Sequence, residues 1–280
     1  MATKDQRRRQ LAREKFQRQQ ERRAEARGKT RRRNAAIAAG VAVVVAIGTA
    51  AWATEGFGGM GEKKQDAAAS PSPSEPSKAP DPCDKPAKGK PGTEQWKKEP
   101  AMTIDKSAAY VLNLETTCGD IDIKMDASKT PHTVNSFNFL ADEGYFDHTK
   151  CHRLVPQGIY VLQCGDPKGD GTGGPGYTIP DENLKDPRLK GNVYPAGTVA
   201  MANKYNAQEK KGRDTGGSQF FLVYQDSQLP PDYTPFGTIG KDGMKVLEKI
   251  AKAGAAPPDA MQNTAPNATV VINKATVRKS

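Results

Sequence analysis

Residues 151–166 read CHRLVPQGIYVLQCGD, and residues 217–221 read GSQFF. In the first stretch, the runs 152–155 and 159–163 are rich in apolar residues and are separated by the turn-forming sequence Pro-Gln-Gly. This pattern predicts a β-hairpin with one run in each strand. The second stretch opens another apolar run, which predicts a strand over residues 219–224.

The rest of the chain after residue 100 continues in short strands joined by turns. A helix is predicted to start at Thr130, with Pro131 at its first position, and to stop at Gly144. A second helix is predicted over residues 243–253. Further strands are expected at residues 109–114, 121–125, 198–201, 236–239 and 269–277. Many short strands with only two helices predict a mainly β fold, a closed antiparallel barrel with helices over its ends.

The net positive charge of the chain is confined to its first residues. Residues 1–33 contain 14 Lys and Arg against four acids, a net +10, which equals the formal net charge of all 280 residues. Residues 34–280 therefore sum to zero, with 28 basic and 28 acidic residues. A neutral folded portion offers no basic face for phosphate groups, so we expect no nucleic-acid partner.

An apolar stretch follows this basic tail. Residues 35–53 carry no charge, and as a helix these 19 residues would extend about 28 Å, close to the thickness of a bilayer core. We predict a transmembrane helix over residues 34–53 that anchors the chain in the cell membrane as a single-pass protein. The arginines at 31–33 predict a cytoplasmic N-terminus and an extracytoplasmic C-terminal domain. Cleavage near residues 51–53 would instead give a secreted form, and the sequence leaves this open.

Residues 54–100 have a different composition, rich in Gly, Ser, Lys and Ala and containing eight prolines. Such a stretch has too few large apolar side chains to build a core, so we predict a disordered linker. The folded domain is then expected over residues 101–280.

Six blocks of this domain resemble, in the same order, the signature motifs of one family. Gly217–Phe221 is identical to the motif G-S-Q-F-F. The other blocks are Cys151–Pro156 (F-H-R-x-x-P), Tyr160–Asp166 (F-M-x-Q-G-G-D), the glycine-rich Gly171–Gly174, Val199–Asn203 (S-M-A-N) and Phe236–Gly237 (V-F-G). The family is the cyclophilins, and an ordered set of this kind is specific.

The resemblance implies a peptidyl-prolyl cis/trans isomerase built on an eight-stranded cyclophilin-like barrel capped by two helices. It implies catalytic roles for Arg153, Gln163 and Phe221. The implied substrate-binding residues are Tyr160, Val161, Ala202, Asn203, Gln219, Leu229 and Tyr233. We expect a monomer without metal or cofactor that acts on proline-containing unfolded or flexible polypeptides. This chemistry needs no nucleophile, because rotation about the amide is opposed only by a resonance barrier of about 18–20 kcal/mol.

The sequence departs from the family pattern at several positions. Arg153 and Gln163 are two residues further apart than the commonest spacing, with Gln157-Gly158 as the extra pair, which we expect the turn to absorb. Val161 replaces a methionine, and Tyr233 stands where many members carry histidine. Gln228 occupies the position of a tryptophan in cyclosporin-sensitive members, which predicts weak inhibition by cyclosporin.

The four cysteines, Cys83, Cys118, Cys151 and Cys164, either pair outside the cytoplasm or remain buried thiols. Cys151 and Cys164 flank the predicted hairpin, Cys118 is another possible partner, and all three complete pairings stay open. The His and Cys spacings do not match a metal site.

Two other functions stay open at this point. One is a non-catalytic module that binds proline-containing peptides as a chaperone or scaffold at the cell envelope. The other is a structural envelope protein in which the basic tail and linker perform the main task.

Overall fold

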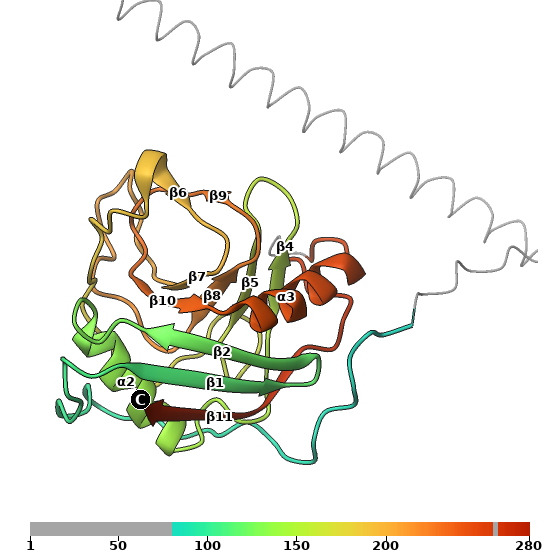
Figure 1. Cartoon of the computed structure of the whole chain (residues 1–280), viewed down its shortest axis with the longest axis horizontal. Coiled ribbons are helices and arrows are strands. Elements are labelled where there is room, and N and C mark those ends of the chain that lie inside the picture. Colours follow the sequence, from blue (N-terminus) through green and yellow to red (C-terminus); the bar gives the residue numbers. More distant parts are fainter. Residues whose placement is uncertain (1–79, 260–262) are drawn as a thin grey trace, which may run out of the picture. The chain divides into compact units, whose positions relative to one another are not determined.

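The computed structural model describes residues 80–259 and 263–280 (Figure 1). The predicted basic tail, the predicted transmembrane helix and the predicted linker up to residue 79 lie outside the described residues. Within the described part of the chain, no helix combines the length and the apolar character needed to cross a membrane.

A curled antiparallel sheet of nine strands forms the body of the domain (Figure 1). Its spatial order is β3-β11-β1-β2-β10-β7-β8-β5-β4. The strands are β1 (Tyr110–Thr116), β2 (Gly119–Met125), β3 (Thr149–Lys150), β4 (Arg153–Val155), β5 (Val161–Cys164), β7 (Thr198–Met201), β8 (Phe220–Val223), β10 (Pro235–Ile239) and β11 (Val271–Lys279). Two short strands, β6 (Val193–Tyr194) and β9 (Ser227–Gln228), pair separately.

The prediction of a closed eight-stranded barrel is corrected by this topology. The two ends of the strand order, β3 and β4, are consecutive in the chain, and no ladder joins them in the described residues. The backbone changes partners between them, because Cys151 N–H donates to the carbonyl of Val270 (2.9 Å) and His152 N–H donates to that of Gln163 (3.1 Å). The two edges of the sheet are therefore connected through the backbone of Cys151 and His152, and not by a hydrogen-bonded ladder between β3 and β4.

Two α-helices pack on the sheet, as predicted. α2 (Pro131–Asp142) buries Val134, Phe137 and Leu140, and Gly144 follows its end with φ 66°. α3 (Lys241–Ala253) begins two residues before the predicted start and buries Leu247 and Ile250. A 3-10 turn, η1 (Lys190–Asn192), precedes β6.

The start of α2 is capped by a residue that the sequence does not indicate. The hydroxyl of Thr130 donates to the carbonyl of Asp126 and makes no cap. Instead, the carboxylate of Glu182 accepts hydrogen bonds from the backbone N–H groups of His132 (3.1 Å) and Thr133 (2.9 Å). A carboxylate is favourable there, because the first N–H groups of a helix lack partners and carry partial positive charge.

Alternation along the strands divides the buried residues between two clusters. In β8, Phe220 and Leu222 belong to the main core inside the curl, whereas Phe221 and Val223 belong to a smaller cluster. The rings of Phe137 and Phe236 are 4.7 Å apart in the main core. Because side chains alternate with a period of two, the strands β5, β7 and β8 contribute to both clusters.

Residues 80–100, here called the strap, lie against the domain, although the sequence assigned them to the linker. Cys83 is disulfide-bonded to Cys118, and the Trp96 ring packs edge-on to Phe139 at 5.0 Å. The composition of the strap suits a linker, but one cystine and one tryptophan supply the attachment that average composition does not reveal. The other cysteines form the Cys151–Cys164 bond, so this pairing is the one that the structure selects.

Candidate active site

Three adjacent strands bring the predicted catalytic residues onto one face of the sheet. Arg153 in β4 is paired in register with Gln163 in β5, and Gln163 is paired with Phe221 in β8. Directly opposed residues of neighbouring strands point to the same side. The three side chains are therefore neighbours, and all three line one pocket.

A chain of polar contacts holds the arginine. Arg153 Nη1 donates to Gln163 Oε1 at 3.4 Å, and Gln163 Nε2 donates to Gln219 Oε1 at 2.8 Å. Gln219 Nε2 in turn donates to the carbonyls of Gly171 (3.0 Å) and Gly173 (2.9 Å). A guanidinium carries five N–H donors, so Arg153 can hold Gln163 and still donate to a ligand.

The pocket beside this arginine, here called the proline pocket, has a volume of about 160 Å³. Its lining consists of Arg153, Ile159, Val161, Gln163, Ala202, Asn203, Phe221, Leu229 and Tyr233. Most of these side chains are apolar, and the rings of Phe221 and Tyr233 meet edge-on at 5.4 Å. The pocket thus combines one cation with an apolar wall.

Two of the predicted site residues lie elsewhere. Tyr160 packs edge-on to Tyr224 at 5.8 Å, and Ile159 lines the proline pocket instead. Ile159 lies two positions before Val161, which also lines the pocket, and alternate residues of an extended segment point to one side. Gln219 is not in the pocket lining but lines the adjoining groove.

The wall formed by Leu229 and Tyr233 is held by residues that sequence reasoning did not single out. Tyr194 is fully buried, and its hydroxyl donates to the carbonyl of Tyr233 at 2.7 Å. The carboxylate of Asp232 is ion-paired with Arg213. Neither Tyr194 nor Arg213 lies in a recognisable motif, so only the folded arrangement reveals their role.

Asn203 also supports this wall rather than presenting its side chain to a ligand. Its Nδ2 donates to the carbonyl of Asp232 at 2.8 Å, and its Oδ1 accepts from the backbone N–H of Tyr205 at 3.1 Å. The side-chain amide is engaged within the protein. A substrate contact at this position would therefore come from the backbone of Asn203 or Ala202.

The site is partly desolvated, and this affects its titratable groups. Burial lowers the pKa of Arg153 below its usual value, and the neighbouring Tyr233 opposes this. Burial likewise raises the pKa of Tyr233, to which Asp232 adds. Arginine remains protonated under all ordinary conditions, so the pocket contains a permanent cation with reduced hydration.

The glycine-rich loop next to the site is shaped by a buried carboxylate. Asp166 accepts hydrogen bonds from the backbone N–H groups of Lys168 (2.8 Å) and Gly171 (2.7 Å). The carboxylate thus organises the loop backbone. Among the described residues, no group of three or more His, Cys, Asp or Glu is placed to hold a metal ion.

Comparison with known proteins identifies the family. The model described as "Cyclophilin type peptidyl-prolyl cis-trans isomerase/CLD" matches residues 111–277, more than half of the chain. The chain belongs to this family. The resemblance seen in the sequence motifs is thereby confirmed.

Several curated cyclophilins are similar to this chain. "Probable peptidyl-prolyl cis-trans isomerase B" of Mycobacterium leprae is 51% identical over 157 residues, which are 53% of this chain and 51% of the relative. The protein of the same name from Mycobacterium tuberculosis H37Rv is 50% identical over 157 residues, with 53% and 49% covered. A "Peptidyl-prolyl cis-trans isomerase" of Helicobacter pylori 26695 is 37% identical over 139 residues, with 49% and 77% covered. The chain spans about half the length of the two mycobacterial relatives.

Proposed function

We propose that this cyclophilin catalyses cis/trans isomerisation of prolyl peptide bonds and that Arg153 stabilises the twisted amide. The observation that carries the proposal is the position of Arg153 in the pocket lining, facing an apolar wall and held by Gln163. An apolar pocket suits the proline ring, and a fixed cationic donor suits the polar amide beside it.

The proposed chemistry follows from the origin of the barrier. Rotation breaks the amide resonance, so the nitrogen regains its lone pair as the bond twists. A donor aimed at that nitrogen binds the twisted amide better than either planar form, which is the condition for a lower barrier. Loss of one such preorganised donor typically costs about 10²–10³ in rate.

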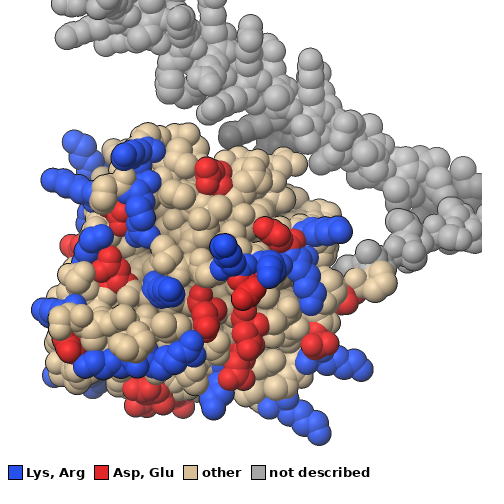
Figure 2. All heavy atoms as spheres, in the orientation of Figure 1, with Lys and Arg blue, Asp and Glu red and all other residues tan. Residues whose placement is uncertain are grey.

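The proposed substrates are unfolded or flexible polypeptides that contain proline. The proline pocket opens to the surface, so a chain segment can enter it without unfolding of the enzyme. On the face shown in Figure 2, lysines and arginines are interspersed with acidic residues rather than gathered into one basic patch. Residues 34–280 also have a formal net charge of zero, so the domain as a whole favours no strongly charged class of chain.

This activity is tested by exchange spectroscopy on a peptide that contains one prolyl bond. The full-length protein is expected to accelerate the cis/trans exchange of the peptide at catalytic concentrations. Binding of the peptide without any acceleration would contradict the proposed catalysis and would support the non-catalytic binding module instead.

We also propose that the domain acts outside the cytoplasm, where slow prolyl steps delay the folding of exported proteins. The basic residues 1–33 followed by the uncharged residues 35–53 support this orientation. The two disulfides of the domain are typical of an oxidising compartment. Protease treatment of intact cells tests the proposal: loss of the domain supports it, and protection until the cells are lysed contradicts it.

A further inference from the structure

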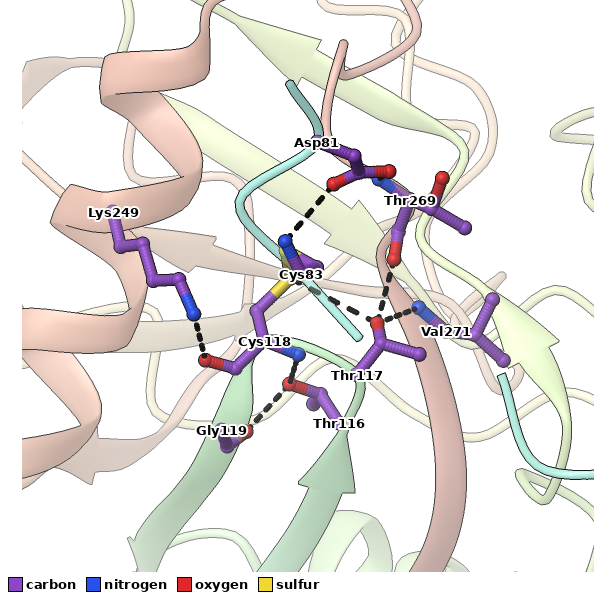
Figure 3. Close-up of a disulfide and its surroundings, with 9 residues drawn as sticks. All are labelled: Asp81, Cys83, Thr116, Thr117, Cys118, Gly119, Lys249, Thr269 and Val271. Atoms are coloured by element: carbon purple, nitrogen blue, oxygen red, sulfur yellow. Dashed lines mark hydrogen bonds between the residues drawn. A yellow bond between two sulfur atoms is a disulfide. The ribbon is translucent and has the colours of Figure 1, made fainter. Parts of the chain in front are cut away.

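The strap is attached at its start to the domain body. Cys83 is disulfide-bonded to Cys118 in the turn between β1 and β2 (Figure 3). The carboxylate of Asp81 accepts hydrogen bonds from the backbone N–H groups of Cys83 (3.0 Å) and Thr269 (2.9 Å), as Figure 3 shows. One covalent bond and one hydrogen bond to a second loop therefore fix this end of the strap.

The other end of the strap is attached to the glycine-rich loop. The backbone N–H of Trp96 donates to the carbonyl of Pro175 at 2.8 Å. Gly176 lies so close that a Cβ at this position would come within 2.7 Å of the carbonyl oxygen of Trp96. The strap and the loop that contacts Gln219 are thus packed backbone to backbone.

This attachment places Gln95 beside the proposed active site. The Gln95 side chain is exposed, and its Nε2 donates to the carbonyl of Gly174 at 3.4 Å. Gln95 lines a groove of about 380 Å³, here called the middle groove, together with Gln163 and Gln219. The middle groove shares Gln163, Ala202 and Asn203 with the proline pocket, so the two are continuous.

A further groove continues onto the strap. This strap groove has a volume of about 330 Å³ and is lined on one side by residues 90–95. On the other side lie Tyr145, Pro167 and Lys168. It shares Gln95, Gly173 and Gly174 with the middle groove. Proline pocket, middle groove and strap groove therefore form one run of connected depressions.

We propose that the strap extends the substrate-binding surface and that Gln95 is a specificity-determining residue within it. A polypeptide with its proline in the proline pocket would continue through the middle groove onto the strap groove. The proposal rests on the proposed function, because the occupant is the same polypeptide chain. The family model begins at residue 111, so the strap is outside the region that it matches.

The chemistry of Gln95 suits an extended chain of variable sequence. A side-chain amide offers two N–H donors and a carbonyl acceptor, which complement the N–H and C=O groups of any peptide backbone. An extended chain advances about 3.3 Å per residue, so a segment that continues beyond the proline follows the connected depressions towards the strap. We therefore expect the strap to favour long peptides over short ones, and to depend little on which side chains the long peptide carries.

The test compares two peptides with the same residues around one proline. The first is a short blocked peptide that contains only those residues, and the second is extended on both sides. Dissociation constants and kcat/KM are measured for the full-length protein, for Gln95→Ala and for Lys97→Ala. Lys97 is an exposed strap residue that lines none of the three depressions, and it serves as the matched control.

We expect the wild type and Lys97→Ala to bind the long peptide more tightly than the short one. Gln95→Ala should reduce this preference by about two- to tenfold, the effect of losing one hydrogen bond. An unchanged preference in Gln95→Ala, or equal affinity of the wild type for both peptides, would overturn the role of the strap. Binding without isomerisation of either peptide would instead count against the proposed function, and the binding preference would still decide about the strap.

Discussion

The two disulfides differ in the length of chain that they close, and this predicts a measurable difference in their stabilisation. Cys83 and Cys118 are separated by 35 positions, and Cys151 and Cys164 by 13. In the chain-entropy model, loops of these lengths correspond to about 3.8 and about 2.9 kcal/mol at 25 °C. The longer loop is therefore expected to contribute about 0.9 kcal/mol more to the free energy of unfolding.

The measurement uses two variants that each keep one disulfide. Cys151→Ala/Cys164→Ala retains the strap disulfide, and Cys83→Ala/Cys118→Ala retains the one that joins Cys151, before β4, to Cys164 in β5. Each is unfolded with denaturant in its oxidised and in its reduced form, so that the difference isolates the cross-link at constant sequence. This design removes the cost of truncating Cys164, which is fully buried.

We expect a larger loss on reduction when the remaining disulfide is the one in the strap. The opposite order, with the shorter loop contributing clearly more, would show that local packing rather than chain entropy determines the stabilisation. Little change in either variant would refute the entropic reasoning altogether.

Three further predictions concern single positions. Hydrogen bonds from Arg188 lower the pKa of Asp186 from 3.8 to about 2, so the stabilisation by Asp186 is present above about pH 4 and is lost as the pH falls towards 2. Acid titration of unfolding should show a smaller loss over this window in Asp186→Asn, and identical curves would contradict the assignment. Gly165→Ala should lower the free energy of unfolding by more than about 1–2 kcal/mol, because φ is +84° and a Cβ would collide with a backbone carbonyl, whereas Gly174→Ala should be tolerated. Because Gln228 is exposed and replaces an aromatic contact, cyclosporin should inhibit weakly and Gln228→Trp should increase the inhibition; nanomolar inhibition of the wild type would show the reasoning to be wrong.

Local patterns predicted most of the secondary structure. The sequence Thr130-Pro131 marks the start of α2, and Gly144 follows its end, because proline and glycine act through their own backbone preferences. Short apolar runs likewise located β7 and β8. Local patterns could not predict the order of the strands or whether the sheet closes into a barrel. Both depend on hydrogen bonds between segments that lie far apart in the chain.

The strap shows a second limit. Its prolines and lysines indicate a linker. An argument from average composition gives every residue the same weight, so it misses the effect of a single cysteine or tryptophan. The attachment depends on Cys83 and Trp96, whose partners Cys118 and Phe139 lie outside the strap. A long-range partner of this kind leaves no local signal.

The sequence motifs predicted the catalytic residues of the candidate site, but not all the residues that line or support the pocket. Arg153, Gln163 and Phe221 follow from motifs, and the structure brings them together. Ile159 rather than Tyr160 lines the pocket, and this depends on how the segment before β5 packs, which the motif does not specify. Tyr194 supports the wall through its hydrogen bond to the carbonyl of Tyr233, and it lies in none of the motifs.

The most direct test of the proposed mechanism measures catalysis and binding separately in Arg153→Ala. Removing the donor should lower kcat/KM for a prolyl peptide by about 10²–10³. The dissociation constant of the peptide should change much less, because the apolar side chains of the pocket lining, among them Phe221 and Leu229, remain. Arg153→Lys keeps the charge without the planar set of donors, so it should restore only part of the rate. If Arg153→Ala isomerises the peptide as fast as the wild type, Arg153 does not stabilise the twisted amide.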